Sequence, residues 1–161
     1  MSQDGAQDRS LRDHLLELLK GGSAHLGFDG AVDGLPAELR GRKPPGLPHT
    51  VWQLVEHLRL AQLDILDFSR NPDYEERKFP DDYWPATEAP PSDEAWSQSI
   101  EAFRRDLQAM KDLVADPKTD LFAKIPWGDG QTILREAMLV ADHNAYHVGQ
   151  IVVVRQGLGA W

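Results

Sequence analysis

Two histidines near the C-terminus have the spacing of a metal-binding pair. His143 and His147 stand four residues apart in an apolar stretch that the sequence predicts to be helical. On a helix, residues four apart lie one turn above each other with their β-carbons about 5–6 Å apart, so both imidazoles can reach the same ion. A pair supplies only two donors, and metal chemistry in a protein needs at least one more.

His57 is the best candidate for the third donor. It lies within a second predicted helix, on the apolar stripe that faces the core. We therefore predict a three-histidine metal site made of His57, His143 and His147. The alternative stays open that all three residues are core or surface histidines that bind no metal.

The other histidines have simpler interpretations. His14 fits an exposed helix position, and His49 lies beside the start of the second predicted helix. His25 follows two glycines and could line the mouth of a pocket, although an ordinary exposed residue is the simpler interpretation.

The donor types restrict the ion and its chemistry. The chain has no cysteine, so a metal must use nitrogen and oxygen ligands. Neutral imidazoles suit zinc, nickel, copper or iron. Three protein donors leave a position open for water or substrate, which is typical of a catalytic rather than a structural ion.

Asp64 and Glu136 are the candidates for a supporting or proton-accepting carboxylate. Asp64 comes seven residues after His57, and Glu136 comes seven before His143. Seven residues are close to two helical turns, so each carboxylate is expected near the face of its histidine. The loop residue Asp129 could also serve. The sequence identifies no definite general base.

The His-Glu-x-x-His motif of metalloproteases is absent, because Asn144 stands where the glutamate would be.

Three functions stay open for this chain. They are a metal-dependent transferase or hydrolase, a metal-binding bundle without catalysis that acts by dimerisation or sensing, and a bundle without metal.

Four amphipathic helices are predicted to position these residues. They run from a cap at Ser10 to Gly21-Gly22, from a Thr50/Gln53 capping box to Asn71-Pro72, from Ser92 to Asp116-Pro117, and from about Thr132 to Gln156. Residues 23–39 are either a further helical segment or an ordered loop, and residues 40–49 are a linker. Residues 69–92 form a proline-rich crossover long enough to let the second and third helices run parallel.

The pattern predicts an all-α fold, a four-helix bundle in one domain over residues 1–161, because no strand pattern or repeat is present. The net charge of -9 disfavours a nucleic-acid partner. The N-terminus lacks a signal-peptide pattern, and no apolar run approaches the ~20 residues that span a bilayer. We expect no membrane partner and a cytoplasmic location.

The segment His143-Asn144-Ala145-Tyr146-His147-Val148-Gly149-Gln150, with His57 on an earlier helix, resembles the DinB/YfiT-like superfamily of metal-binding four-helix bundles over nearly the whole chain. The resemblance implies an up-down-down-up bundle and a divalent ion, often zinc or nickel, held by residues matching the three histidines. It also implies frequent homodimers. Some relatives are thiol transferases or isomerases that use small thiols, and many have no assigned activity. The glycine-broken first helical region and the aromatic residues 80–85 depart from the family pattern.

Two further expectations concern partners. The last predicted helix is apolar on several sides, with a continuous run from Ile151 to Val154, which favours a homodimer. The open position of the ion is expected to bind a small thiol or anionic molecule, in a pocket lined by Tyr83 and Trp84 of the crossover.

Overall fold

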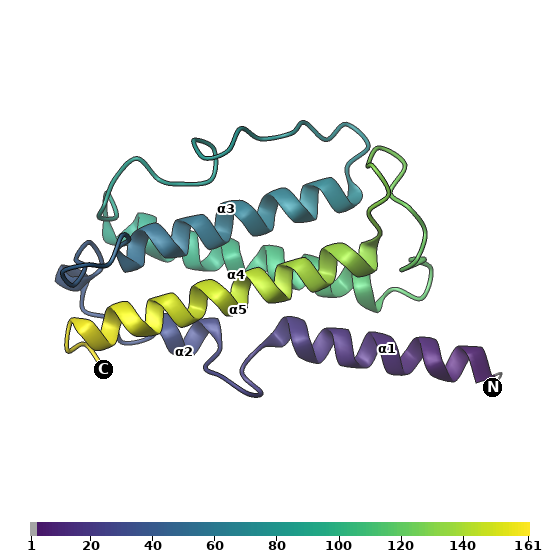
Figure 1. Cartoon of the computed structure of the whole chain (residues 1–161), viewed down its shortest axis with the longest axis horizontal. Helices are drawn as coiled ribbons and strands as arrows, with labels where there is room; N and C mark the ends of the chain where they lie inside the picture. Colours follow the sequence, from purple (N-terminus) through teal and green to yellow (C-terminus); the bar gives the residue numbers. More distant parts are fainter. Residues whose placement is uncertain (1–2) are drawn as a thin grey trace.

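The computed structural model describes residues 3–161 and consists of helices joined by ordered loops (Figure 1). Its elements are α1 (Gln3–Lys20), α2 (Phe28–Val32), the 3₁₀ turn η1 (Ala37–Leu39), α3 (Val51–Arg70), α4 (Asp93–Ala115) and α5 (Ile133–Gly157). Within residues 3–161 no strand forms, and extended pairing is limited to an isolated bridge between Lys124 and Thr132. The predicted all-α class is confirmed.

The long helices run in two directions. In Figure 1, α3 and α4 run the same way along the molecule, and α1 and α5 run the opposite way. The crossover between α3 and α4 runs back along the outside of α3. It returns the chain to the end where α3 begins, and α4 can therefore run parallel to α3. The crossover passes over the part of α3 that carries His57, since the carbonyl oxygen of Tyr83 lies 2.9 Å from Nδ1 of His57.

Side-chain caps set the starts of the three helices that frame the site. The Thr50 side chain accepts a hydrogen bond from the Gln53 amide, and the Gln53 side chain accepts one from the Thr50 amide, which completes the predicted capping box of α3. Ser92 caps α4 and Thr132 caps α5, because their side chains accept from the Ala95 and Arg135 amides. These starts agree with the sequence prediction.

The predicted start of the first helix was wrong. α1 begins at Gln3, so Ser10 lies inside the helix and is exposed rather than acting as its cap. No proline or glycine pair interrupts the preceding turns, and Arg12 pairs with Asp8 four residues earlier at 2.9 Å. The predicted end at Gly21-Gly22 is correct, because both glycines adopt positive φ, 66° and 82°.

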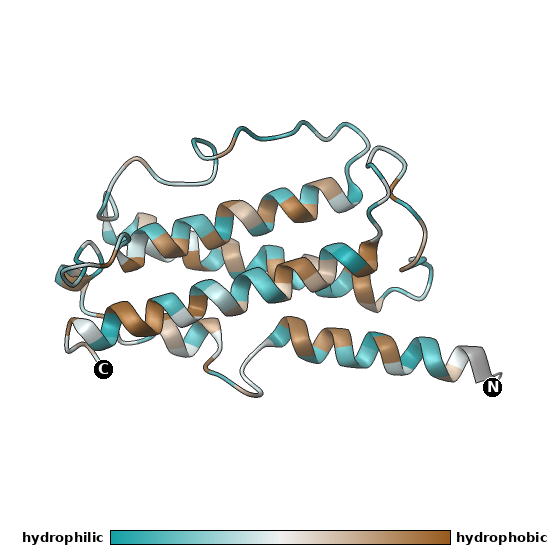
Figure 2. Cartoon of the chain, viewed as in Figure 1, coloured by the Kyte–Doolittle hydropathy of each residue, from teal (hydrophilic) through white to brown (hydrophobic). Residues whose placement is uncertain are grey.

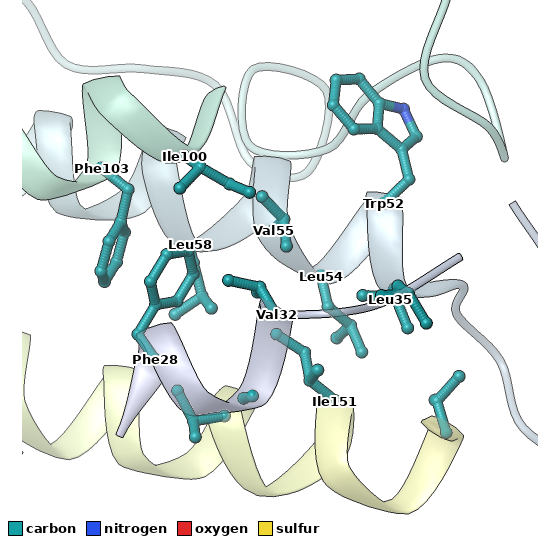
Figure 3. Close-up of a cluster of buried hydrophobic side chains, with 14 of the residues drawn as sticks. Phe28, Val32, Leu35, Trp52, Leu54, Val55, Leu58, Ile100, Phe103 and Ile151 are labelled. Carbon is teal, nitrogen blue, oxygen red and sulfur yellow. The ribbon is translucent and has the colours of Figure 1, made fainter. Parts of the chain in front are cut away.

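Because the chain breaks after α1, two separate helices, α1 and α2, pack against different halves of the long helices α3, α4 and α5. One cluster of buried residues surrounds α2, with Phe28 and Val32 packed among side chains of α3, α4 and α5 (Figure 3). The other cluster joins Leu15 and Leu19 of α1 to the opposite half of the long helices. The residues between 23 and 39 therefore contain a short helix and a 3₁₀ turn rather than one long element.

Each long helix carries both apolar and polar residues, as amphipathic packing requires (Figure 2). No helix in the described part of the chain is long and apolar enough to cross a membrane. The apolar run near the end of α5 is mostly covered by the chain itself, since Ile151 and Val154 are buried and Val153 is 51% exposed.

A polar residue of α3, Gln62, is buried in the core. Gln62 is 1% exposed, its Nε2 donates to the carbonyl of Phe103 at 2.7 Å, and its Oε1 accepts from Asn144 Nδ2 at 2.9 Å. These bonds tie α3 to α4 and α5 beside the histidines. A glutamine can occupy this core position only because both ends of its amide have partners.

Candidate metal centre

The three predicted histidines meet between α3 and α5. His57 comes from α3, and His143 and His147 come from successive turns of α5. The Nε2 atom of His57 lies 3.1 Å from Nε2 of His147 and 3.1 Å from Nε2 of His143. One ring nitrogen from each residue lies within 4.8 Å of the others, which is close enough for a single ion to contact all three.

Hydrogen bonds at the far side of two rings determine their tautomers. Nδ1 of His57 lies 2.9 Å from the carbonyl oxygen of Tyr83, and Nδ1 of His147 lies 2.7 Å from Oε1 of Gln150. Both partners accept, so each Nδ1 carries the proton when the ring is neutral. The Nε2 atoms of His57 and His147, which lie 3.1 Å apart, therefore present lone pairs and no protons.

Burial keeps these rings neutral. Burial and the neighbouring His147 and His57 lower the pKa of His143 to about 3. Burial is also the main cause that lowers the pKa of His147 to about 4, and it lowers the pKa of His57. Neutral imidazole is the form that binds a metal ion.

The donor set fits a divalent ion better than it fits a metal-free core. The Nε2 atoms of His57 and His147 face each other as lone pairs, which repel because neither atom carries a proton that could make a hydrogen bond. Among residues 3–161, the buried Nδ1 of His143 has no hydrogen-bond partner. A cation at the convergence of the three Nε2 atoms would remove the repulsion, and three neutral nitrogens suit zinc or nickel.

The family model described as the DinB superfamily matches residues 27–151, which is most of the chain. The chain belongs to the DinB superfamily. The match begins after α1 and covers α2 to most of α5, including all three histidines. No curated protein and no solved structure matches the chain.

In this DinB-superfamily chain the crossover covers the histidines with an aromatic ring. Trp84 stacks on His57 with ring centroids 3.9 Å apart and planes 2° apart. His49 stacks on Trp84 at 4.1 Å, so the indole lies between two imidazoles. His49, Trp84 and His57 therefore form one stack of rings.

The two candidate carboxylates lie together, away from the imidazoles. Asp64 and Glu136 are 8% and 2% exposed, and both line a cavity of about 460 Å³ that also contains Tyr83 and Asp129. Among the described residues, neither carboxylate hydrogen-bonds to the three histidines. Seven residues along a helix correspond to ~10 Å, which accounts for the separation.

Another cavity, more apolar, lies beside His147. It has a volume of about 370 Å³, and its lining includes Gln150, His49, Tyr146 and Val153. Gln150 binds His147, and His49 lies on Trp84, so the cavity borders residues that contact the histidine cluster. Neither Tyr83 nor Trp84, which were predicted to line the ligand pocket, lines this cavity, and Tyr83 lines the carboxylate cavity instead.

Several contributors were not identified from the sequence. The Tyr83 carbonyl could not be, because every residue has a backbone carbonyl and only the path of the crossover brings this one to His57. The stacking of His49 also depends on that path. Gln150 could have been assigned more definitely, since it lies one turn after His147 and can accept from its Nδ1.

Proposed function

We propose that this DinB-superfamily protein binds one divalent ion, zinc or nickel, through His57, His143 and His147, and that it is a metal-dependent enzyme for a small molecule. Thiol S-transfer or hydrolysis is the proposed reaction class. The observation that supports the proposal is the convergence of three imidazole Nε2 atoms, those of His57 and His147 free of protons. We further propose that α1, α3, α4 and α5 form the up-down-down-up bundle expected of such proteins.

A bound ion would act as a Lewis acid that keeps its full charge, because no donor is anionic, and would lower the pKa of a thiol or water beside it. The residues of the chain hold and shield that position. Tyr83 and Gln150 orient two of the rings through Nδ1. Trp84 covers one face of His57 and keeps water from it.

The cavity beside His147 supports a small substrate with an apolar part. Its wall is mostly apolar, with Leu47, Leu54 and Val154 in addition to Tyr146 and Val153. Polar contacts are available from His49 and Gln150, which contact Trp84 and His147 respectively. A small thiol or anion would place its charged atom toward the ion and its apolar part along this wall.

A second candidate function is a metal-binding homodimer without catalysis, which acts in sensing or interaction. Exposed apolar residues of α5 favour it: Met138, Tyr146 and Val153 are 49%, 64% and 51% exposed. These positions fall within one broad side of the helix. Tyr146 and Val153 also line the apolar cavity, so a second copy packed there would close that cavity.

Cobalt-substituted protein titrated with small thiols tests the enzymatic proposal. A thiolate bound to the ion should produce sulfur-to-metal charge-transfer absorption, and His143→Ala should abolish it. A subsequent screen with thiols and electrophiles should detect transfer. If several thiols at millimolar concentration leave the spectrum of metal-loaded protein unchanged, the transferase is excluded and hydrolysis or the non-catalytic dimer is left.

A further inference from the structure

Asp64 is a hub for hydrogen bonds from the crossover. Its Oδ1 accepts from the hydroxyl of Tyr74 at 3.0 Å and its Oδ2 from the hydroxyl of Tyr83 at 2.6 Å. Arg77 Nε lies 3.5 Å from Oδ1. All three partners belong to the segment between α3 and α4, whereas Asp64 is buried on α3. This carboxylate therefore fastens the crossover to the helix that carries His57.

Both carboxylate oxygens are already occupied, which disfavours Asp64 as a proton acceptor in catalysis. Each tyrosine hydroxyl donates to a different oxygen of Asp64. The role of Asp64 is therefore to hold the crossover in place through these two tyrosines.

Tyr83 connects Asp64 to the metal centre through its two ends. Its hydroxyl donates to Asp64, and its backbone carbonyl accepts from Nδ1 of His57 at 2.9 Å. The next residue, Trp84, stacks on the same imidazole. One dipeptide thus sets both the tautomer and the plane of the His57 ring, and the position of that dipeptide depends on the anchor at Asp64.

We propose that Asp64 is a positioning residue, which holds Tyr83 so that the Tyr83 carbonyl keeps the proton of His57 on Nδ1 and leaves Nε2 free for the ion. This inference deepens the proposed function and rests on it for the ion, but not for the tautomer. Partners of this kind around a ligand typically change metal affinity about 10–100-fold when they are removed.

Tyr83→Phe and Tyr74→Phe form a matched pair for the test. Each removes one hydroxyl hydrogen bond to Asp64, but only Tyr83 has a carbonyl on His57. Zinc affinity of the full chain would be measured by competition with a chromophoric chelator. We expect Tyr83→Phe and Asp64→Asn to weaken binding about tenfold or more, and Tyr74→Phe to change it by less than about threefold. Circular dichroism would check that each variant is folded.

The tautomer of His57 in metal-free protein gives a second measurement that does not depend on binding. Nitrogen-15 NMR should show the proton on Nδ1 in the wild type and a mixture of tautomers in Tyr83→Phe and Asp64→Asn. Equal losses of affinity in both tyrosine variants, or an unchanged tautomer in Tyr83→Phe and Asp64→Asn, would overturn the inference. A wild type that binds no zinc would instead refute the metal site, and the tautomer measurement would still decide the role of Asp64.

Discussion

The imidazoles of His57 and His147 each donate Nδ1–H to an oxygen that can only accept, while Nδ1 of His143 has no partner among residues 3–161. At the residue scale, these hydrogen bonds determine which ring nitrogen carries the proton and which is free to bind an ion. The spacing of His143 and His147 was sufficient to predict their pairing. The atoms that orient the rings could not be predicted fully, because one of them is a backbone carbonyl that a distant loop brings into place.

Gln150→Leu is expected to weaken metal binding about 10–100-fold, because it removes the acceptor that keeps the proton of His147 on Nδ1. Gln150→Glu is the matched control, since a carboxylate accepts the same hydrogen bond and should preserve affinity. Chelator competition measures both. Identical affinity in the leucine variant and the wild type would show that the tautomer of His147 does not matter for binding.

The depressed histidine pKa values predict that metal-free protein loses stability in mild acid. Below the ordinary pKa of 6.5 the unfolded chain binds protons at these residues, whereas folded His143 and His147 do not until the pH approaches about 3 and about 4. The unfolded state is therefore favoured progressively from pH 6.5 down to about 4. Allowing for partial solvent access, the loss between pH 7 and pH 5 should be roughly 1–3 kcal/mol.

Urea denaturation of metal-free protein at several pH values measures this loss. His143→Asn should show a smaller dependence on pH over the same range, because it removes one of the depressed groups. An equal dependence in wild type and variant would assign the acid sensitivity to other residues.

At the scale of the helix, the caps and apolar stripes could be predicted from the sequence, because each depends on residues that are close together in the chain. Thr50 and Ser92 bond within their own first turns, so a few neighbouring residues reveal them. The start of α1 was mispredicted, because Ser10 has the right type for a cap but no interruption precedes it. The burial of Gln62 and Arg12 was not predictable from their own helices, since their partners lie on other elements.

Arg12 joins α1 to the end of α4. It is 8% exposed and donates to the carbonyls of Val114, Asp116 and Thr119 at 2.7, 3.0 and 2.8 Å. Arg12→Ala should reduce the free energy of unfolding by about 2–3 kcal/mol, because carbonyls at the helix end lose a charged donor. Thermal and urea denaturation measure the change.

Arg12→Lys is the control for that experiment. It keeps the charge but cannot reach three carbonyls with a planar fork, so its stability should lie between those of the alanine variant and the wild type. An alanine variant as stable as the wild type would mean that α1 is held by its apolar contacts alone.

At the scale of the whole molecule, the exposed apolar residues of α5 predict a homodimer. Light scattering should give twice the monomer mass, and Val153→Glu should shift the protein toward monomer, because a charge at the interface would be desolvated. Ala123→Glu, in the exposed loop before α5, is the control and should leave the mass unchanged. A monomer at concentrations well above micromolar would contradict the prediction and leave the apolar cavity open to solvent.

The metal content of protein purified without an affinity tag tests the central claim most directly. Elemental analysis should find one divalent ion per chain in the wild type, and His57→Ala, His143→Ala and His147→Ala should each lose most of it while circular dichroism shows a folded helical protein. Full stoichiometric metal in any two of these variants, or a wild type that takes up no zinc or nickel on reconstitution, would contradict the three-histidine centre.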